Sequence, residues 1–291
     1  MQRTFEVSGP VELELRLAAG EIEIDPSLEG RVEIELTAHD EETQHAIDEA
    51  RVELQEHPDR PHVIVDVPLR RGGFSFGLVF GRSGVTCRVR CPEGSLVNVK
   101  SKSADLVARG SIGGLTVQTA SGDIEVDRVL GGINVKSASG DVAAREVAGG
   151  VSVQTASGDV ELEVVRGAMS ITTASGDVTI GEAHDNVSTN TVSGDQDHGA
   201  VMIGHVSAHS VSGDVQIGVR RGSRVFLDCT TVSGDTSSEL DVTADAPAGD
   251  GPLVEIKAKT VSGDIRITRA AAAKSTAPAT APSDTEQEVH A

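Results

Sequence analysis

The chain has 291 residues, a formal net charge of −20, and a hydrophobic fraction of 38% that includes no Trp, no Tyr and only five Phe. That fraction is enough to build a core, which excludes a chain that is disordered throughout. The negative charge makes nucleic acid an unexpected partner, because phosphates would be repelled. With so few aromatic side chains, the core must consist of Val, Ile, Leu, Ala and Thr, which is typical of stacked β-strands.

Residues 1–68 are predicted to form a strand-rich cap that contains one short helix. The run VELELRLAAGEIEID (11–25) alternates apolar and polar residues and resembles one coil of the repeat described below, with Ala19-Gly20-Glu21 at its corner. Asp40 is predicted to cap a helix that begins at Glu41, because acidic side chains are favoured at the positive end of a helix. Such a cap would protect the end of a stacked core.

The N-terminal sequence MQRTFEVSGPVELELRL lacks a basic segment followed by an apolar one, which is the pattern of a secretion signal. No stretch of the chain approaches the roughly 18 uninterrupted apolar residues of a transmembrane helix. We therefore expect a cytoplasmic protein without a transmembrane segment.

Residues 69–96 are predicted to comprise a loop rich in Phe and Gly, RRGGFSFGLVFGRSG (70–84), followed by a strand that leads into the repeats. The loop either folds over the protein as a lid or contacts a protein partner or a membrane, because an apolar tip on a basic base suits such contacts. The candidate contact residues are Phe74, Phe76, Phe80, Arg70, Arg71, Arg82, Arg88 and Arg90.

The strand in this region has the sequence VTCRVRC. Cys87 and Cys91 share its inward face with two valines and lie about 13 Å apart along the strand, which is too far for a disulfide. They are predicted to be buried reduced thiols, and Cys229 also falls in a core position of the repeat. With the cysteines inward, Arg88 and Arg90 point outward and extend the basic surface.

The tripeptide Ser-Gly-Asp divides residues 97–268 into coils. Its copies begin 18 residues apart and then at intervals of 19, 21 and 29 residues, at positions 121, 139, 157, 175, 193, 212, 233 and 262. Apolar and polar residues alternate on both sides of each corner with no 3.6-residue period, so each coil contains two short strands and no helix. Two such strands bury their apolar face only by stacking. The pattern predicts an all-β fold, a parallel β-solenoid whose coils stack in chain order.

The Ser-Gly-Asp corners are predicted to be structural, because Gly tolerates the positive φ of a tight corner and Ser or Asp can hydrogen bond to turn amides. An inward column beside them could form a hydrogen-bonded ladder of Thr119, Ser137, Thr155, Thr173 and Thr191. The alternative is a cation site, since stacked aspartates repel one another, but the calcium-binding pattern Gly-Gly-x-Gly-x-Asp is absent. No metal is expected at the corner residues Gly122, Asp123, Gly140, Asp141, Gly158, Asp159, Gly176, Asp177, Gly194, Asp195, Gly213, Asp214, Gly234, Asp235, Gly263 and Asp264.

Motifs for catalysis and cofactor binding are missing from the sequence, which has no HExxH, paired Cys-x-x-Cys, Walker or dinucleotide-binding glycine pattern.

Gln196 and His198 replace the inward apolar pair of one coil, which predicts a solvated or bulged coil rather than a zinc site. Residues 269–291 have no pattern and are predicted to be a disordered tail. We therefore expect neither an enzyme nor a cofactor.

The repeated T-[AV]-S-G-D-[VI] pattern, preceded by CPEGSLVNVKSKSADL (91–106), resembles the bacterial toastrack family, an adhesin-like domain of unknown function related to LiaG-like domains. The resemblance covers residues 10–268. It implies a β-solenoid, no known catalytic activity and an association with envelope-stress systems, and it brings no established functional residues.

These observations lead to one main hypothesis and two alternatives. We expect a non-enzymatic structural or interaction scaffold that binds an unknown protein, an envelope-associated partner or a second copy of itself. The alternatives are a carbohydrate-active β-helix and a rod stabilised by divalent cations. The first alternative lacks the aromatic subsites that such enzymes use, and the second lacks the calcium-binding pattern.

Overall fold

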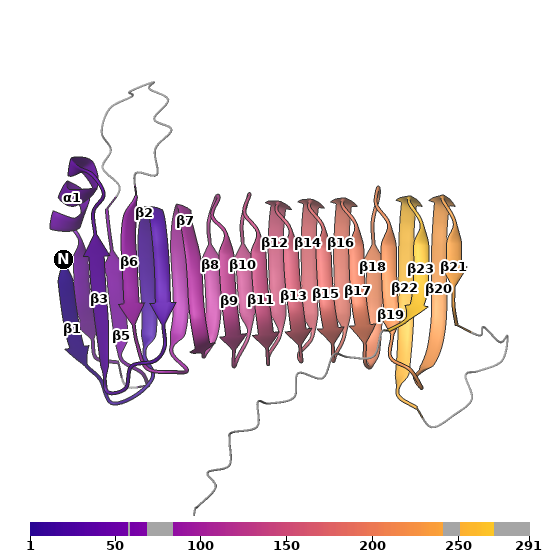
Figure 1. The fold of residues 1–291 in the computed structure, drawn as a ribbon, viewed down its shortest axis with the longest axis horizontal. Coiled ribbons are helices and arrows are strands. Elements are labelled where there is room, and N and C mark those ends of the chain that lie inside the picture. Colours follow the sequence, from indigo (N-terminus) through magenta and orange to yellow (C-terminus); the bar gives the residue numbers. More distant parts are fainter. Residues whose placement is uncertain (58, 69–83, 241–250, 271–291) are drawn as a thin grey trace, which may run out of the picture.

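The structure is a computed structural model that describes residues 1–57, 59–68, 84–240 and 251–270. The chain winds into a rod with two strands in each coil, stacked as a parallel β-solenoid (Figure 1). The predicted fold is therefore confirmed. The Phe- and Gly-rich stretch 69–83 and the stretch 271–291 of the predicted tail lie outside the described residues. Within the part of the chain that is described, no helix has the length and apolarity needed to cross a membrane.

The central coils pair strand by strand at the predicted offset. For example, Val151 lies in parallel register between Ile133 of the preceding coil and Met169 of the following one. The alternating side chains form closed inward columns, in which Val135 and Val153 are completely buried. The first strands of these coils are β8 (Gly114–Gln118), β10 (Ile133–Lys136), β12 (Val151–Ser157), β14 (Met169–Ser175), β16 (Val187–Ser193) and β18 (Gly204–His209). The second strands are β9 (Ile124–Val129), β11 (Val142–Val147), β13 (Val160–Val165), β15 (Val178–Ala183), β17 (Gln196–Val201) and β19 (Val215–Val219).

The N-terminal segment forms a coil inside the stack. The first half of β2 (Glu12–Asp25) pairs with β5 (His62–Asp66) on one side and with the start of β7 (Leu96–Ile112) on the other. Its second half pairs with β6 (Val85–Arg90) and with the rest of β7. Parallel stacking therefore extends into the residues predicted to form the cap, and the coil of β5 and β6 lies outside β2.

Antiparallel strands and a helix close this end of the rod. The strand β3 (Arg31–Thr37) lies between β6 and β1 (Gln2–Glu6), and β4 (Arg51–Gln55) pairs with β5. The predicted short helix is confirmed as α1 (Glu41–Asp48), which buries Ile47 against the core. Asp40 caps α1, because its carboxylate accepts a hydrogen bond from the backbone N–H of Thr43 at 2.7 Å.

The last two coils do not follow chain order. The strand β22 (Leu253–Ser262) lies between β18 and β20 (Arg224–Ser233), and β23 (Ile265–Arg269) lies between β19 and β21 (Thr236–Ser238). The prediction of sequential stacking is wrong here. The reason is that the Ser-Gly-Asp pattern identifies each coil, but every coil presents the same corner and the same alternation to its neighbours, so the pattern does not specify their order.

Pairs of introduced cysteines test this order. His209 and Lys259 are register partners on β18 and β22, and Thr230 of β20 pairs with Lys259 from the other side. In a background with Cys229→Ala, the pair His209→Cys/Lys259→Cys should react with a short bifunctional thiol reagent. The pair His209→Cys/Thr230→Cys should not, because two strand spacings of about 10 Å separate these positions. The reverse result, measured by mass spectrometry, would contradict the inserted coil.

Candidate functional site

The Ser-Gly-Asp corners form a continuous hydrogen-bonded ladder along the rod. In each step, the Oδ1 atom of one aspartate accepts a hydrogen bond from the backbone N–H of the aspartate in the adjacent coil, with N···O distances of 2.8 to 3.1 Å. In spatial order the ladder contains Asp105, Asp123, Asp141, Asp159, Asp177, Asp195, Asp214, Asp264 and Asp235.

This ladder gives the stacked carboxylates a structural role. Each bond joins a charged acceptor to a backbone donor of the next coil, and such charge-assisted bonds are stronger than neutral ones. The predicted hydrogen bonding of aspartate to corner amides is found, but between coils rather than within one. Among the described residues, no group of three or more His, Cys, Asp or Glu side chains is arranged to hold a metal ion.

The corner glycines are required for two reasons. All eight have the predicted positive φ, between +130° and +152°, which side chains other than Gly rarely adopt. In addition, a Cβ atom at Gly158 would lie 2.2 Å from the carbonyl oxygen of Gly140 in the adjacent coil, and the other corners are equally tight. The close approach of the backbones therefore excludes a side chain even where the dihedral angle could be tolerated.

The inward Thr and Ser column does not form the predicted ladder. Four of its five hydroxyl groups donate to corner carbonyl groups of their own coil instead, as Ser137 does to Ser139 at 2.9 Å and Thr155 to Ser157 at 3.3 Å. The Thr173 hydroxyl is buried without a hydrogen-bond partner. The column thus stiffens four corners separately, while the aspartates connect the corners.

A buried polar cluster lies in the coil formed by β16 and β17. Thr189, Gln196 and His198 are at most 1% exposed, so the prediction of a solvated coil is wrong. The Thr189 hydroxyl donates to Gln196 Oε1 at 2.5 Å, and Gln196 Nε2 donates to Thr191 Oγ1 and to the carbonyl oxygen of His209. A predicted irregularity is present, because the register between β17 and β19 shifts after His198.

His198 is the least satisfied member of this cluster. Its Nε2 atom lies 3.4 Å from Thr189 Oγ1, and its Nδ1 atom has no hydrogen-bond partner. The ring occupies a column between Ile180 and Ile217, where it is shielded from water. Burial lowers the pKa of His198 to about 4, because the charged imidazolium would lose its hydration. The side chain is therefore neutral at pH 7.

The outward arginines of β6 are engaged by acidic neighbours. Arg88 and Arg90 point outward as predicted, but Arg88 Nε lies 2.6 Å from Glu23 Oε2, and Arg90 Nη1 lies 3.8 Å from Glu33 Oε2. The hydrogen bond from Arg88 lowers the pKa of Glu23. These two arginines thus lie among carboxylates and do not form a separate basic surface. The other candidate contact residues (Phe74, Phe76, Phe80, Arg70, Arg71 and Arg82) lie outside the described residues.

Cys87 of β6 and Cys91, which directly follows this strand, are buried as predicted. Cys87 and Cys91 have no exposed surface. Burial raises the pKa of Cys87 to about 12 and that of Cys91 to about 11, so both are protonated thiols of low reactivity at neutral pH.

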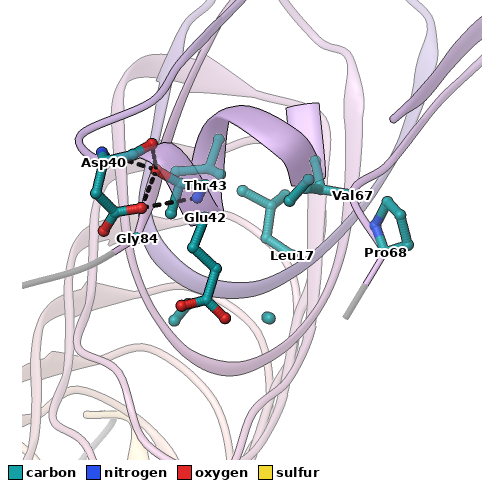
Figure 2. A pocket seen from close by; sticks show the side chains of 11 residues that line it. Leu17, Asp40, Glu42, Thr43, Val67, Pro68 and Gly84 are labelled. Atoms are coloured by element: carbon teal, nitrogen blue, oxygen red, sulfur yellow. Dashed lines mark hydrogen bonds between the residues drawn. The ribbon is translucent and has the colours of Figure 1, made fainter. Parts of the chain in front are cut away.

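A hollow of about 190 Å³ lies at the capped end, beside α1 (Figure 2). Pro68 and Gly84 both line it, and these residues flank the Phe- and Gly-rich stretch 69–83. The chain therefore leaves for this stretch and returns from it at the hollow. The remaining lining is mainly apolar with an acidic rim and consists of Leu17, Ala18, Ala19, Asp40, Glu42, Thr43, Ala46, Val67 and Val85.

An exposed row of valines was not predicted. Val192, Val211, Val261 and Val232 precede the corner serines of four adjacent coils and are 48 to 79% exposed. The four coils that precede them in the stack have Ala at this position. The sequence change from T-A-S-G-D to T-V-S-G-D could have revealed this row. The valines form an apolar stripe on the half of the rod that is remote from the cap.

Residues 11–268 match the family model described as Toastrack DUF4097, which covers most of the chain. The chain belongs to the toastrack family. The resemblance inferred from the repeats is thereby confirmed. No curated protein sequence matches this toastrack chain.

Several solved structures are similar to this toastrack chain at low sequence identity. A "putative adhesin" from Bacteroides fragilis is 10% identical with a TM-score of 0.43, and the match covers 92% of this chain and 96% of that chain. A "putative lipid binding protein" from Parabacteroides distasonis is 13% identical with the same TM-score and the same coverage. A "putative cell adhesion protein" from Clostridium sporogenes is 11% identical with a TM-score of 0.29, covering 92% of this chain and 99% of that chain.

The corner geometry of the toastrack rod predicts the effect of one added methyl group. Gly158→Ala should lower the free energy of unfolding by about 2 kcal/mol or more, because the new Cβ requires both an unfavourable φ and a shift of the neighbouring backbone. The matched control is Gly9→Ala, where a Cβ meets nothing within 4 Å. Equal melting temperatures for the two variants would contradict the close approach.

The buried imidazole predicts a loss of stability in mild acid. Because the pKa of His198 is lower in the folded chain than in the unfolded one, stability is complete above about pH 6.5 and falls by up to about 1.4 kcal/mol per pH unit until about pH 4. Replacing His198 by Ile should reduce the fall in melting temperature between pH 7 and pH 5. The half-exposed control His205→Ala should keep the wild-type fall. An unchanged fall in His198→Ile would contradict this assignment.

Proposed function

We propose that this toastrack domain is a non-enzymatic interaction scaffold, an adhesin-like rod that displays contact surfaces to a protein or envelope-associated partner. The observation that carries the proposal is the aspartate ladder. The aspartate that recurs in the coils from β7 to the open end is bonded to the backbone of its neighbour and thereby connects one coil to the next. The repeated chemistry therefore builds a rigid support, which leaves recognition to features that differ from coil to coil.

Two such features are apolar and lie at different places on the rod. One is the Phe-containing stretch 69–83, which joins the described structure at the hollow beside α1. The other is the row of exposed valines on the far half of the rod. Apolar surface that remains exposed on a folded domain is typical of protein or membrane contacts. We assign the principal contact to the Phe-containing stretch, because it combines three Phe with Arg70, Arg71 and Arg82.

The cellular setting of this contact remains a prediction from the sequence. We propose a cytoplasmic rod that acts in envelope stress, as the family association implies. The partner would then present an apolar patch beside acidic groups, which complements the Phe and Arg side chains of the stretch.

Recovery of partners from cell extract tests the assignment of the contact. The triple variant Phe74→Ser/Phe76→Ser/Phe80→Ser should recover less than half of the partner that the wild-type chain recovers, because burial of the three rings would drive association. The recovered proteins are compared by quantitative mass spectrometry. The matched control is Val192→Ser/Val211→Ser, which removes apolar surface elsewhere and should leave recovery unchanged. Undiminished recovery by a triple variant with wild-type melting temperature would exclude the stretch as the contact.

A further inference from the structure

The end of the rod opposite α1 finishes in a coil with a free edge (Figure 1). Among the described residues, β20 pairs only with β22 and β21 only with β23, so the outer edge of this coil presents backbone N–H and C=O groups without strand partners. Natural proteins usually block such an edge with a cap, a bulge or a charged residue, because it is a template for pairing with another strand.

The core is also less covered at this end than elsewhere in the rod. The inward residues Val225, Leu227 and Cys229 of β20 are only partly buried, although they pack against the core. Their register partners on β22, which lies one coil further in, are completely buried. The outward residue Phe226 is 54% exposed. The last coil therefore carries apolar surface on its inner side and its outer side, and a further strand would cover both.

Charge favours this end over the other for contact between two copies. Residues 1–66 contain 18 acidic and 5 basic side chains, so the capped ends of two copies would repel each other. The three coils at the open end (204–240 and 251–270) contain 6 acidic and 7 basic side chains. Two copies therefore repel each other less at the described coils of the open end than at the capped end.

The sequence of β20 is complementary to itself in antiparallel order. Arg224, Phe226 and Asp228 lie on its outer side, and Val225 and Leu227 face the core. When two copies of this strand pair antiparallel with Phe226 opposite Phe226, Arg224 of each copy lies opposite Asp228 of the other. Val225 then lies opposite Leu227, because directly opposed residues share a face of the sheet. The same register thus forms two ion pairs, one aromatic pair and two apolar pairs.

We propose that this toastrack domain forms a dimer in which β20 pairs antiparallel with β20 of a second copy. The contact is two-fold symmetric, so it pairs the β20 edge of one copy with the β20 edge of the other and closes at a dimer instead of continuing into a filament. Arg224 Nε also donates a hydrogen bond to the carbonyl oxygen of Gly251, at 3.0 Å, which ties this side chain to the coil of β22. The dimer is independent of the partner contact proposed above, because Pro68 and Gly84, which flank the Phe-containing stretch, lie at the opposite end of the rod.

Reversal of the two charges tests both the contact and its register. Arg224→Asp and Asp228→Arg should each raise the dimer dissociation constant about tenfold or more. In each variant, residues 224 and 228 carry the same charge, so both of the ion pairs between the copies become repulsive. The double variant Arg224→Asp/Asp228→Arg should restore the wild-type constant. An equimolar mixture of the two single variants should form a mixed dimer, since their charges are complementary. The measurement is sedimentation equilibrium of the full-length chains over a concentration series.

Control variants separate the contact from general effects on charge and folding. Lys136→Asp reverses a charge on the outward face of a central coil and should leave dimerisation unchanged. Phe226→Lys should abolish dimerisation, because an edge lysine blocks strand pairing. Each variant must keep the wild-type melting temperature.

Three results would overturn the proposal: a wild-type chain that stays monomeric at the highest concentration, assemblies that keep growing beyond a dimer, or a double variant that behaves like the single ones. Because these measurements use only the purified chain, none of these results bears on the recovery of partners through the Phe-containing stretch.

Discussion

The close approach of consecutive corners is the constraint on which the rest of this structure depends. At each Ser-Gly-Asp corner the backbones come so near that a Cβ atom on the glycine would overlap a carbonyl oxygen of the next coil. That proximity also brings a backbone N–H within 2.8 to 3.1 Å of a neighbouring aspartate carboxylate. Tight stacking and stabilisation of the carboxylate charges are therefore achieved by the same geometry, and a row of aspartates that would repel one another in isolation becomes a stabilising element.

Once the corners are in register, the other features of the rod follow. Side chains two residues apart align into columns, so an apolar column closes as soon as neighbouring coils stack on both sides. The coil formed by β16 and β17 tolerates Thr189, Gln196 and His198 in its core because their polar atoms largely find one another. The corner ladder also runs without interruption through the inserted coil, from Asp214 to Asp264 and then to Asp235.

The two ends of the rod are built differently, and this difference separates their roles. At one end, antiparallel strands and α1 cover the core, and the hollow beside α1 receives both flanks of the Phe-containing stretch. At the other end, β20 presents an edge and a partly covered core. The acidic side chains concentrate at the covered end, so the dimer contact that we propose lies at the open end, away from the partner contact that we propose at the Phe-containing stretch.

Local patterns in the sequence determined the solenoid, the inward columns, the positive φ of the corner glycines and the helix that begins at Glu41, because each depends on neighbours within a few residues. The tertiary structure alone decided that β2 and β22 are inserted into the stack, since identical corners do not encode which coil lies beside which. It also decided that Gln196 and His198 are buried, as their partners come from another strand. The exposed edge of β20 belongs to this second group, because an edge exists only once the order of the coils is set.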